Sequence, residues 1–239
     1  MSKTLSKQEL QAQNQKIFDA IASKYDFMNK ITSLGMEPIW KRRAVRCLAP
    51  IDTNSAILDL CGGTGDLTNL ALCMYGKGQY IVFDMNENML AAGKHKIPEN
   101  MRQYITYMQG DAMRLPFTEA AFDKVIICFG LRNVPSMQDC LNEIARVLKP
   151  QGLLVCLEFT LPANCFLKLG YKLYMAAFVR LVSILITGKK STYQYLSSSI
   201  AQFAAPYEVR QAIENARLVN KRQIKLFCGV GYIYSAVKL

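Results

Sequence analysis

The segment LDLCGGTGDL (58–67) combines an apolar run, two acids and a cluster of glycines. Glycine allows positive φ and a close backbone approach to a ligand, so the segment predicts a binding turn after a buried strand. Two phosphate-binding fingerprints do not fit: counted from Gly63, the third glycine of G-x-G-x-x-G is replaced by Thr68, and G-K-[ST] is missing. The acids Asp59 and Asp66 repel phosphate and attract a cation, so we expect an uncharged or positive ligand.

Two more acids follow the next two predicted strands. Asp84 ends the second strand in VFD, and Asp111 follows the third in GDAMRLPF. A carboxylate at the first position can accept both ribose hydroxyls, and one at the second can accept from an adenine amine. Acids at three successive strand ends beside a glycine loop suit S-adenosylmethionine, which carries a sulfonium and an ammonium but no phosphate. The sequence therefore predicts that cofactor.

Each acid taken alone has a simpler explanation. Aspartate is common in strand-end turns as a local cap, and Asp59 could stabilise the helix or the loop that follows it. The cofactor prediction depends on the acids forming one site.

Strands and helices alternate through the middle of the chain, which predicts right-handed βαβ units and a parallel sheet with helices on both faces. The predicted strands are 56–60, 80–83, 104–108, 124–129 and 153–159. The predicted helices are 66–74, 87–96 and 137–148, the last ending at the stop signal KPQG (149–152).

Both ends of the chain add to this core. Residues 8–48 show helical spacing with a break near 35–38. A final helix at 208–218 precedes strands at 223–227 and 232–237, which could form a hairpin and an antiparallel edge.

Residues 165–187 form one long apolar helical pattern. Its charges, Lys168, Lys172 and Arg180, argue against a membrane span, which needs about 20 nearly uncharged residues. The helix either covers the C-terminal edge of the sheet or acts as a lid that contacts a lipid-like substrate or the membrane surface. Both interpretations stay open at this point.

Length and composition favour one domain, because 239 residues with 51% hydrophobic content can bury one sizeable core. We divide it into an N-terminal helical cap (1–50), the cofactor-binding core (51–160), a helical lid and substrate region (161–205) and a C-terminal helix with strands (206–239). The eight scattered cysteines and the single His95 argue against a metal site and indicate a reduced, cytoplasmic protein. The net charge of +11 favours acidic partners but does not choose among nucleic acid, anionic lipid and an anionic intermediate.

Several longer motifs carry a family resemblance. They are FDAIASKYDFMN (18–29), LDLCGGTGDL (58–67), GDAMRLPF (110–117), FGLRNV (129–134), RVLKP (146–150), LEFTLP (157–162) and YQYLSSSI (193–200). The second marks methyltransferases broadly, whereas FGLRNV, LEFTLP and YQYL are typical of the ubiquinone/menaquinone biosynthesis C-methyltransferases, which the chain resembles from about residue 16 to near its C-terminus.

This resemblance implies an α/β, Rossmann-like class I methyltransferase fold, with a mostly parallel seven-stranded sheet and an antiparallel C-terminal strand. It implies methyl transfer from S-adenosylmethionine to a ring carbon of a prenylated quinol, from demethylmenaquinol to menaquinol or on the benzoquinol of the ubiquinol pathway. The expected partners are this quinol and an anionic membrane surface at the inner face of the cell membrane, with no nucleic acid. Whether the protein forms a homo-oligomer stays open at this point.

The resemblance also assigns residues. It implies cofactor contacts at Thr64, Asp84, Asp111 and Ala112, with Gly63 and Gly65 shaping the loop. Asp59 and Cys128 complete the predicted cofactor-binding set. Arg132 and Asn133 are the expected catalytic pair: Arg132 stabilises the quinolate and Asn133 orients the ring, although Arg132 could instead be a structural arginine that bridges loop carbonyls or an acid. The substrate-pocket candidates are Tyr25, Asn29 and Tyr193. No residue stands out as the general base.

Three positions depart from the family pattern. Cys61 replaces a small Ala in the glycine loop, and Gln151 replaces the first glycine of a K-P-G-G turn. Tyr234 stands where the C-terminal segment of the family usually has His, so no catalytic role of that His carries over.

Two other functions remain to be weighed. One keeps the methyl donor but makes RNA, protein or another small molecule the acceptor. The other is a non-catalytic scaffold that binds a partner through the helix at 165–187.

Overall fold

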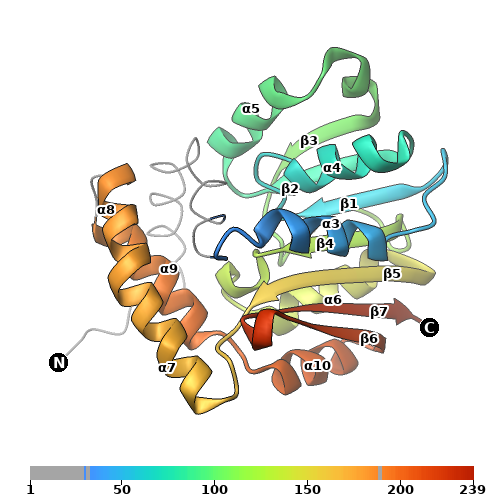
Figure 1. Ribbon diagram of the computed structural model, residues 1–239. Coiled ribbons are helices and arrows are strands. Elements are labelled where there is room, and N and C mark those ends of the chain that lie inside the picture. Colours follow the sequence, from blue (N-terminus) through green and yellow to red (C-terminus); the bar gives the residue numbers. More distant parts are fainter. Residues whose placement is uncertain (1–29, 31–32, 188–189) are drawn as a thin grey trace.

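Seven strands form one sheet in the order β3-β2-β1-β4-β5-β7-β6 (Figure 1). The computed structural model describes residues 30, 33–187 and 190–239. The strands are β1 (Ala56–Leu60), β2 (Gln79–Asp84), β3 (Ile105–Gln109), β4 (Phe122–Cys128), β5 (Leu148–Phe159), β6 (Leu218–Leu226) and β7 (Gly231–Lys238). Strands β1 to β5 pair in parallel, whereas β7 runs antiparallel to both β5 and β6. The predicted mostly parallel sheet with antiparallel C-terminal strands is confirmed.

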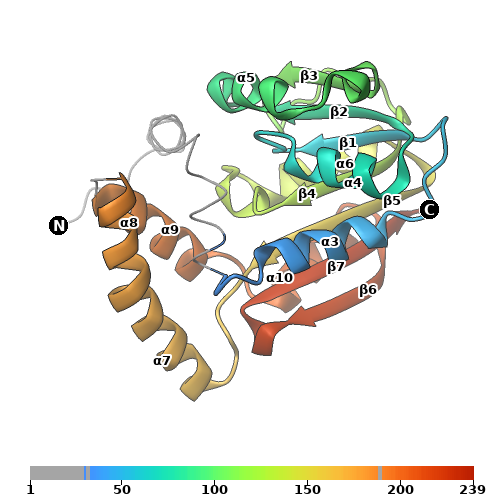
Figure 2. The same cartoon turned by 45° about the horizontal axis from the view of Figure 1, so that its top comes forward.

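Helices cover both faces of the sheet, and each face has its own buried cluster. Helices α3 (Glu37–Cys47) and α4 (Asp66–Tyr75) contribute to one cluster, and α6 (Met137–Val147) and α10 (Pro206–Asn215) contribute to the other. Figure 2 shows α3 and α4 on the near side of the sheet. Helix α5 (Glu87–Lys96) packs on β2 and β3. Short 3₁₀ turns occur at η1 (Glu99–Tyr104), η2 (Leu131–Asn133) and η4 (Phe227–Gly229).

The predicted boundaries fail mainly around β5 and β6. Residues 149–152 do not separate helix from strand, because β5 already begins at Leu148 and jumps in register against β4 between Phe122 and Lys124. Gln151 adopts φ 62°, the left-handed conformation that glycine favours, which fits its position in a turn that usually holds glycine. Strand β6 begins five residues before the predicted strand, since its middle is polar and exposed and lacks an apolar alternation.

The segment predicted as one helix at 165–187 is continuous but contains a π-helical turn. It comprises α7 (Cys165–Tyr174), the π turn η3 (Met175–Val179) and α8 (Arg180–Thr187), followed by α9 (Lys190–Gln202). Figure 1 shows α7, α8 and α9 standing beyond the carboxyl ends of the parallel strands. Within the described ranges, no helix combines the length and apolar character needed to cross a bilayer.

Helix α3 is fastened to the sheet by Trp40. Its side chain is 2% exposed, and its ring meets the ring of Phe159 edge-on with centroids 5.7 Å apart. Phe159 stacks in turn on Phe129 at 4.5 Å. Gly231 of β7 lies against the indole, where an added Cβ would be 3.4 Å from the ring. The indole therefore joins α3 to the ends of β5 and β7.

We predict that Trp40→Ala lowers the free energy of unfolding by about 3–5 kcal/mol, because it leaves a large cavity under α3. Urea unfolding followed by circular dichroism measures this, since Trp40 is the only tryptophan and the variant has no indole fluorescence. Ile39→Ala is the control on the same helix: its side chain is 58% exposed, so a change within about 0.5 kcal/mol is expected. Equal losses in the two variants would contradict the packing role of Trp40.

Candidate cofactor and substrate site

The glycine loop lies where the strand order reverses. In the sheet, β2 and β3 lie to one side of β1, and β4 and β5 lie to the other, so a ligand site is expected at the carboxyl ends of β1 and β4. Between β1 and α4 the loop turns through positive φ at Cys61, Gly63 and Gly65, with values of 54°, 54° and 76°. The N–H of Gly62 donates to the carbonyl of Phe83 at 3.2 Å, which ties the loop to the end of β2.

Asp59 lies beneath this loop and is fully buried. Its Oδ2 accepts from the N–H of Thr68 at 3.2 Å and from the Thr68 hydroxyl at 2.8 Å. Its Oδ1 has no hydrogen-bond partner among the described residues. Burial raises the pKa of Asp59 to about 7, against the opposing effect of the Thr68 hydrogen bonds. This geometry favours the interpretation of Asp59 as an acid that holds the loop to α4.

Asp84 is fixed at the end of β2, beside the loop. Its Oδ2 accepts from the N–H of Gly63 at 2.9 Å, and its Oδ1 accepts from the N–H of Asn86 at 2.8 Å. Burial raises the pKa of this carboxyl, while the backbone hydrogen bonds, that of Asn86 foremost, oppose the rise. The carboxylate is thus held in one orientation at the edge where a ribose was expected.

The end of β3 joins the same edge. The N–H of Gly110 donates to the carbonyl of Asp84 at 3.0 Å, and Oδ1 of Asp111 accepts from the N–H of Met113 at 2.9 Å. The neighbouring Ala112 is buried. The structure therefore brings together the loop, Asp84 and Asp111, as the sequence predicted.

The donors at this edge fit S-adenosylmethionine chemically. Asp84 and Asp111 are acceptors for hydroxyl and amine groups, and among the described residues no lysine or arginine pairs with either of them. Cys61 and Cys128 adjoin the edge as neutral thiols, because burial raises the pKa of both well above the usual thiol value. Such a site is suited to a ligand that is cationic and rich in hydroxyl groups, and unsuited to a phosphate.

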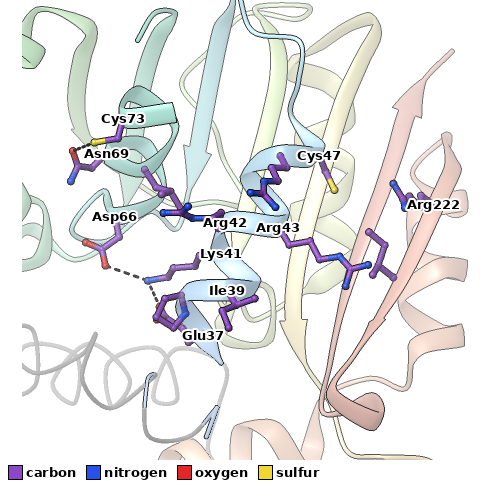
Figure 3. A pocket seen from close by; sticks show the side chains of 14 residues that line it. Glu37, Ile39, Lys41, Arg42, Arg43, Cys47, Asp66, Asn69, Cys73 and Arg222 are labelled. Carbon is purple, nitrogen blue, oxygen red and sulfur yellow. Dashed lines mark hydrogen bonds and ion pairs between the residues drawn. The ribbon is translucent and has the colours of Figure 1, made fainter. Parts of the chain in front are cut away.

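Asp66, the second acid of the loop, contacts α3. Thr64 donates its hydroxyl to Oδ1 of Asp66 at 3.1 Å, and Lys41 of α3 reaches Oδ2 of Asp66 at 3.2 Å. Lys41 also pairs with Glu37, and Lys96 lies 3.8 Å from Asp66. Figure 3 shows the contacts of Lys41 with Asp66 and Glu37 at one end of a groove. Asp66 thus links the loop to α3.

The groove in Figure 3 lies between α3, α4 and β6 and has a volume of about 1090 Å³. It is lined by the exposed side chains of Arg42, Arg43, Arg46 and Arg222, besides Lys41. Positive charge is therefore concentrated on the outer side of α3 and not among the acids at the strand ends.

The FGLRNV turn begins beyond β4 and holds Arg132 in a buried ion pair. The N–H of Phe129, at φ 58°, donates to the carbonyl of Leu157 at 2.8 Å. Arg132 Nη1 pairs with Oε1 of Glu158, and the two side chains are 2% and 1% exposed. The Arg132 N–H also donates to Oε2 of Glu158 at 3.2 Å, and its guanidinium lies 5.4 Å from the ring centroid of Phe159. Arg132 therefore makes the contact expected of a structural arginine, because it bridges to the acid Glu158.

Asn133 connects this turn to α9. Its Nδ2 donates to the carbonyl of Phe129 at 3.0 Å, and its Oδ1 accepts from the hydroxyl of Tyr195 on α9 at 2.6 Å. The YQYL motif predicts Tyr193 as the substrate-pocket residue, but the tyrosine of this motif that reaches Asn133 is Tyr195. Tyr193 lies on α9 with its side chain outside the described set, and Tyr25 and Asn29 lie outside the described residues.

Several residues that shape the site gave little signal in the sequence. Gly93 lies inside α5, where an added Cβ would be 2.4 Å from the carbonyl oxygen of Thr64, so α5 packs directly on the loop. Gly130 lies against Cys61, since a Cβ there would be 2.5 Å from the Cys61 Cβ. A glycine inside a helix destabilises it by about 1 kcal/mol relative to alanine. A glycine at position 93 of a predicted helix therefore indicates a close packing contact.

Helix α7 and the last strand, β7, supply two buried phenols. The Tyr171 hydroxyl has no hydrogen-bond partner among the described residues; burial raises the pKa of Tyr171, and the charge of nearby Arg132 opposes the rise. Tyr234, at the position of the usual His, is 2% exposed within β7, and burial raises its pKa too. Tyr234 is therefore a neutral core residue.

Comparison with known proteins gives consistent results along the chain. Residues 5–238 match the model of the ubiE/COQ5 methyltransferase family. A protein of Pseudomonas fluorescens (strain Pf0-1), named ubiquinone/menaquinone biosynthesis C-methyltransferase UbiE, is 41% identical over 186 residues, covering 77% of this chain and 72% of that protein. A relative of the same name from Ruegeria sp. (strain TM1040) is 36% identical over 237 residues, covering 99% of this chain and 94% of its own.

Solved structures share the fold at low sequence identity. Geranyl diphosphate C-methyltransferase from Streptomyces coelicolor A3(2), in complex with Mg²⁺, geranyl diphosphate and S-adenosyl-L-homocysteine, has a TM-score of 0.63 at 13% identity, covering 85% of this chain and 79% of that one. The [4+2]-cyclase SpnF has a TM-score of 0.62 at 15% identity, covering 82% and 79%. At such identities the likeness shows the fold, and a cyclase among these structures illustrates that fold alone does not fix the reaction.

The burial of Asp59 predicts a pH dependence of stability. Its pKa is about 7 in the folded protein and near the ordinary 3.8 when unfolded, so the folded chain binds more protons between these values. The free energy of unfolding should therefore fall as pH rises through this window, by up to about 1.4 kcal/mol per pH unit. Asp59→Asn, which cannot ionise, should lack this decrease when urea unfolding is compared at pH 5, 6 and 7.

Asp123→Asn is the matched control. The carboxylate of Asp123 accepts from the N–H of Ala56 and from Lys149, and its pKa is lowered below 3.8 despite partial burial. Its stabilising effect is therefore complete above about pH 5, and wild type and this variant should show the same trend from pH 5 to 7. A wild-type profile parallel to that of Asp59→Asn would contradict a buried, protonated Asp59.

Proposed function

The chain belongs to the ubiE/COQ5 methyltransferase family, and we propose that it transfers a methyl group from S-adenosylmethionine to a ring carbon of a prenylated quinol. The substrate proposed first is demethylmenaquinol, giving menaquinol, and the benzoquinol of the ubiquinol pathway is the second. The observation that carries the proposal is the match of residues 5–238 to this family together with its acids at the ends of β2 and β3. The resemblance stated from the sequence motifs, and the methyltransferase fold expected with it, are confirmed.

The residues that would hold the cofactor are those gathered at the strand ends. Asp84 would accept from the ribose hydroxyls and Asp111 from the adenine amine, while Gly63 and Gly65 keep the loop backbone close to the ligand. Ala112 and Cys128 provide a small, neutral wall. When bound, S-adenosylmethionine supplies an electrophilic methyl group on positively charged sulfur.

The reaction requires a more acidic quinol. A ring carbon becomes a good nucleophile when the neighbouring hydroxyl ionises, and a phenol of pKa about 10 must be shifted by about 3 units, or about 4 kcal/mol, to ionise near neutrality. Preorganised charges and donors in a dry site can supply several kcal/mol of this.

Arg132 and Asn133 are the proposed residues for this task. The guanidinium of Arg132 would stabilise the quinolate oxygen, with Glu158 holding it in a fixed orientation. The ion pair reduces the net charge that Arg132 presents, so its contribution would come from directed N–H donors more than from long-range attraction. Asn133, fixed by Phe129 and Tyr195, would set the position of the ring. Tyr25, Asn29 and Tyr193 remain the proposed residues of the substrate pocket.

We also propose that the enzyme works at an anionic membrane surface, where a prenylated quinol resides. The net charge of +11 supports this, since each lysine or arginine near such a surface contributes about 1 kcal/mol of attraction.

Complementation tests the substrate. Expression in a bacterium that lacks quinone C-methylation should restore methylated menaquinone, identified by mass spectrometry of extracted lipids. An Asp84→Ala variant, which loses the carboxylate at the ribose position, should restore none and serves as the control. If neither menaquinone nor ubiquinone returns while the protein is expressed and folded, the substrate proposal is wrong, and a scaffold or another acceptor becomes the better explanation.

Arg132→Lys tests the proposed catalytic role. Lysine keeps the charge but not the planar fork, so turnover at saturating quinol should fall about 100-fold or more, with S-adenosylmethionine affinity nearly unchanged. Arg146→Lys is the matched control, because Arg146 forms a fork with Glu143 on α6, away from the strand ends. Near-normal turnover of Arg132→Lys, with lowered thermal stability, would assign Arg132 a structural role only.

A further inference from the structure

The helical segment from α7 to α8 exposes large apolar side chains in a row. Phe166, Leu169, Leu173 and Leu181 are each between 58% and 81% exposed. The first three, spaced by three and four residues, lie on one face of α7. A contiguous apolar face of this kind is uncommon on a protein that functions free in solution and marks an interaction surface.

The opposite face of the same segment is packed into the protein. Tyr171, Met175 and Val179 are buried and belong to the cluster that also contains residues of α3 and α4. The start of α7 is capped by Asn164, whose Oδ1 accepts from the N–H groups of Phe166 and Leu167. The helix is therefore capped and oriented by contacts within the chain, with its apolar row directed away from the core.

The charged residues around this apolar row indicate an anionic partner. Residues 159–207 contain five lysines and arginines and no aspartate or glutamate. Lys168, Lys172 and Arg180 are exposed beside the row. In a symmetric dimer through this face, lysines of one copy would meet the same lysines of the other without an acid to pair with. An anionic lipid surface satisfies both features, because it accepts apolar side chains and attracts the cations around them.

The segment also adjoins the proposed reaction site. The charge of Arg132 acts on the buried Tyr171 of α7, and α9 contributes Tyr195 to Asn133. We infer that the outer face of α7 and α8 lies in the plane of an anionic bilayer surface, with Phe166, Leu169 and Leu173 entering the acyl boundary. This inference rests on the proposed function for the location of the prenylated substrate, and it names the surface through which that substrate is reached.

Vesicle sedimentation tests the inference with the full chain. Wild type should bind vesicles of phosphatidylglycerol and phosphatidylcholine more tightly than vesicles of phosphatidylcholine alone. Phe166→Ser/Leu169→Ser should weaken binding to both at least tenfold. Lys168→Gln/Lys172→Gln should weaken only the binding to anionic vesicles, about 25-fold at low salt and less at high salt. Tyr207→Ser, at an exposed aromatic of α10, is the control that should bind as wild type does.

A water-soluble, short-tailed quinol separates this inference from the proposed function. The Phe166→Ser/Leu169→Ser variant should methylate it as wild type does, and lose turnover only on a long-tailed quinol in vesicles. Absence of turnover by wild type would overturn the proposed function while leaving the vesicle result readable. The inference would be overturned if both double variants bound vesicles as tightly as wild type does. It would also be overturned if sedimentation velocity showed that wild type is a dimer and that Phe166→Ser/Leu169→Ser dissociates this dimer.

Discussion

The hydrogen bond from the Gly63 N–H to the carboxylate of Asp84 is the contact on which the site depends, because it fixes the loop after β1 against the end of β2. A side chain at Gly63 would be strained at φ 54° and would lie 2.7 Å from Met89 of α5. The loop is thus confined between Asp84 of β2 and Met89 of α5. The side-chain carboxylate that the proposed cofactor would meet is therefore preorganised, because backbone N–H groups of Gly63 and Asn86 hold it in place.

The buried pair of Arg132 and Glu158 imposes a second constraint, on the other side of β1. Removing either partner leaves an uncompensated charge in a region where both side chains are almost fully buried. The pair also joins β5 to the FGLRNV turn, so the same contact positions Asn133 and, through it, Tyr195 of α9. The stability of the fold and the proposed chemistry therefore involve the same residues, so a loss of activity has to be measured together with stability.

Sequence reasoning was most accurate where a short apolar run or a capped helix stands alone, as for β1 and α5, which have the predicted bounds. It failed at β6, whose exposed middle is polar, because an edge strand needs no apolar alternation. Within the site, the acids of the strand ends were predictable, since parallel strands bring their carboxyl ends to one edge. The contacts of Asp59 with Thr68 and of Tyr195 with Asn133 were not, because they depend on which side of a loop or helix a side chain faces.

The segment from α7 to α8 shows how one helical pattern in the sequence can contain two different surfaces. At about 100° per residue, Leu181 would lie about 80° away from Leu173 in a regular α-helix. The π turn η3 between them adds one residue to a turn, which brings Leu181 back to within about 20° of Leu173. The outer apolar row thus continues into α8, while Tyr171, Met175 and Val179 stay buried. The sequence gives no sign of this extra residue, so the predicted single helix could not separate the face that packs on the core from the face that is left exposed.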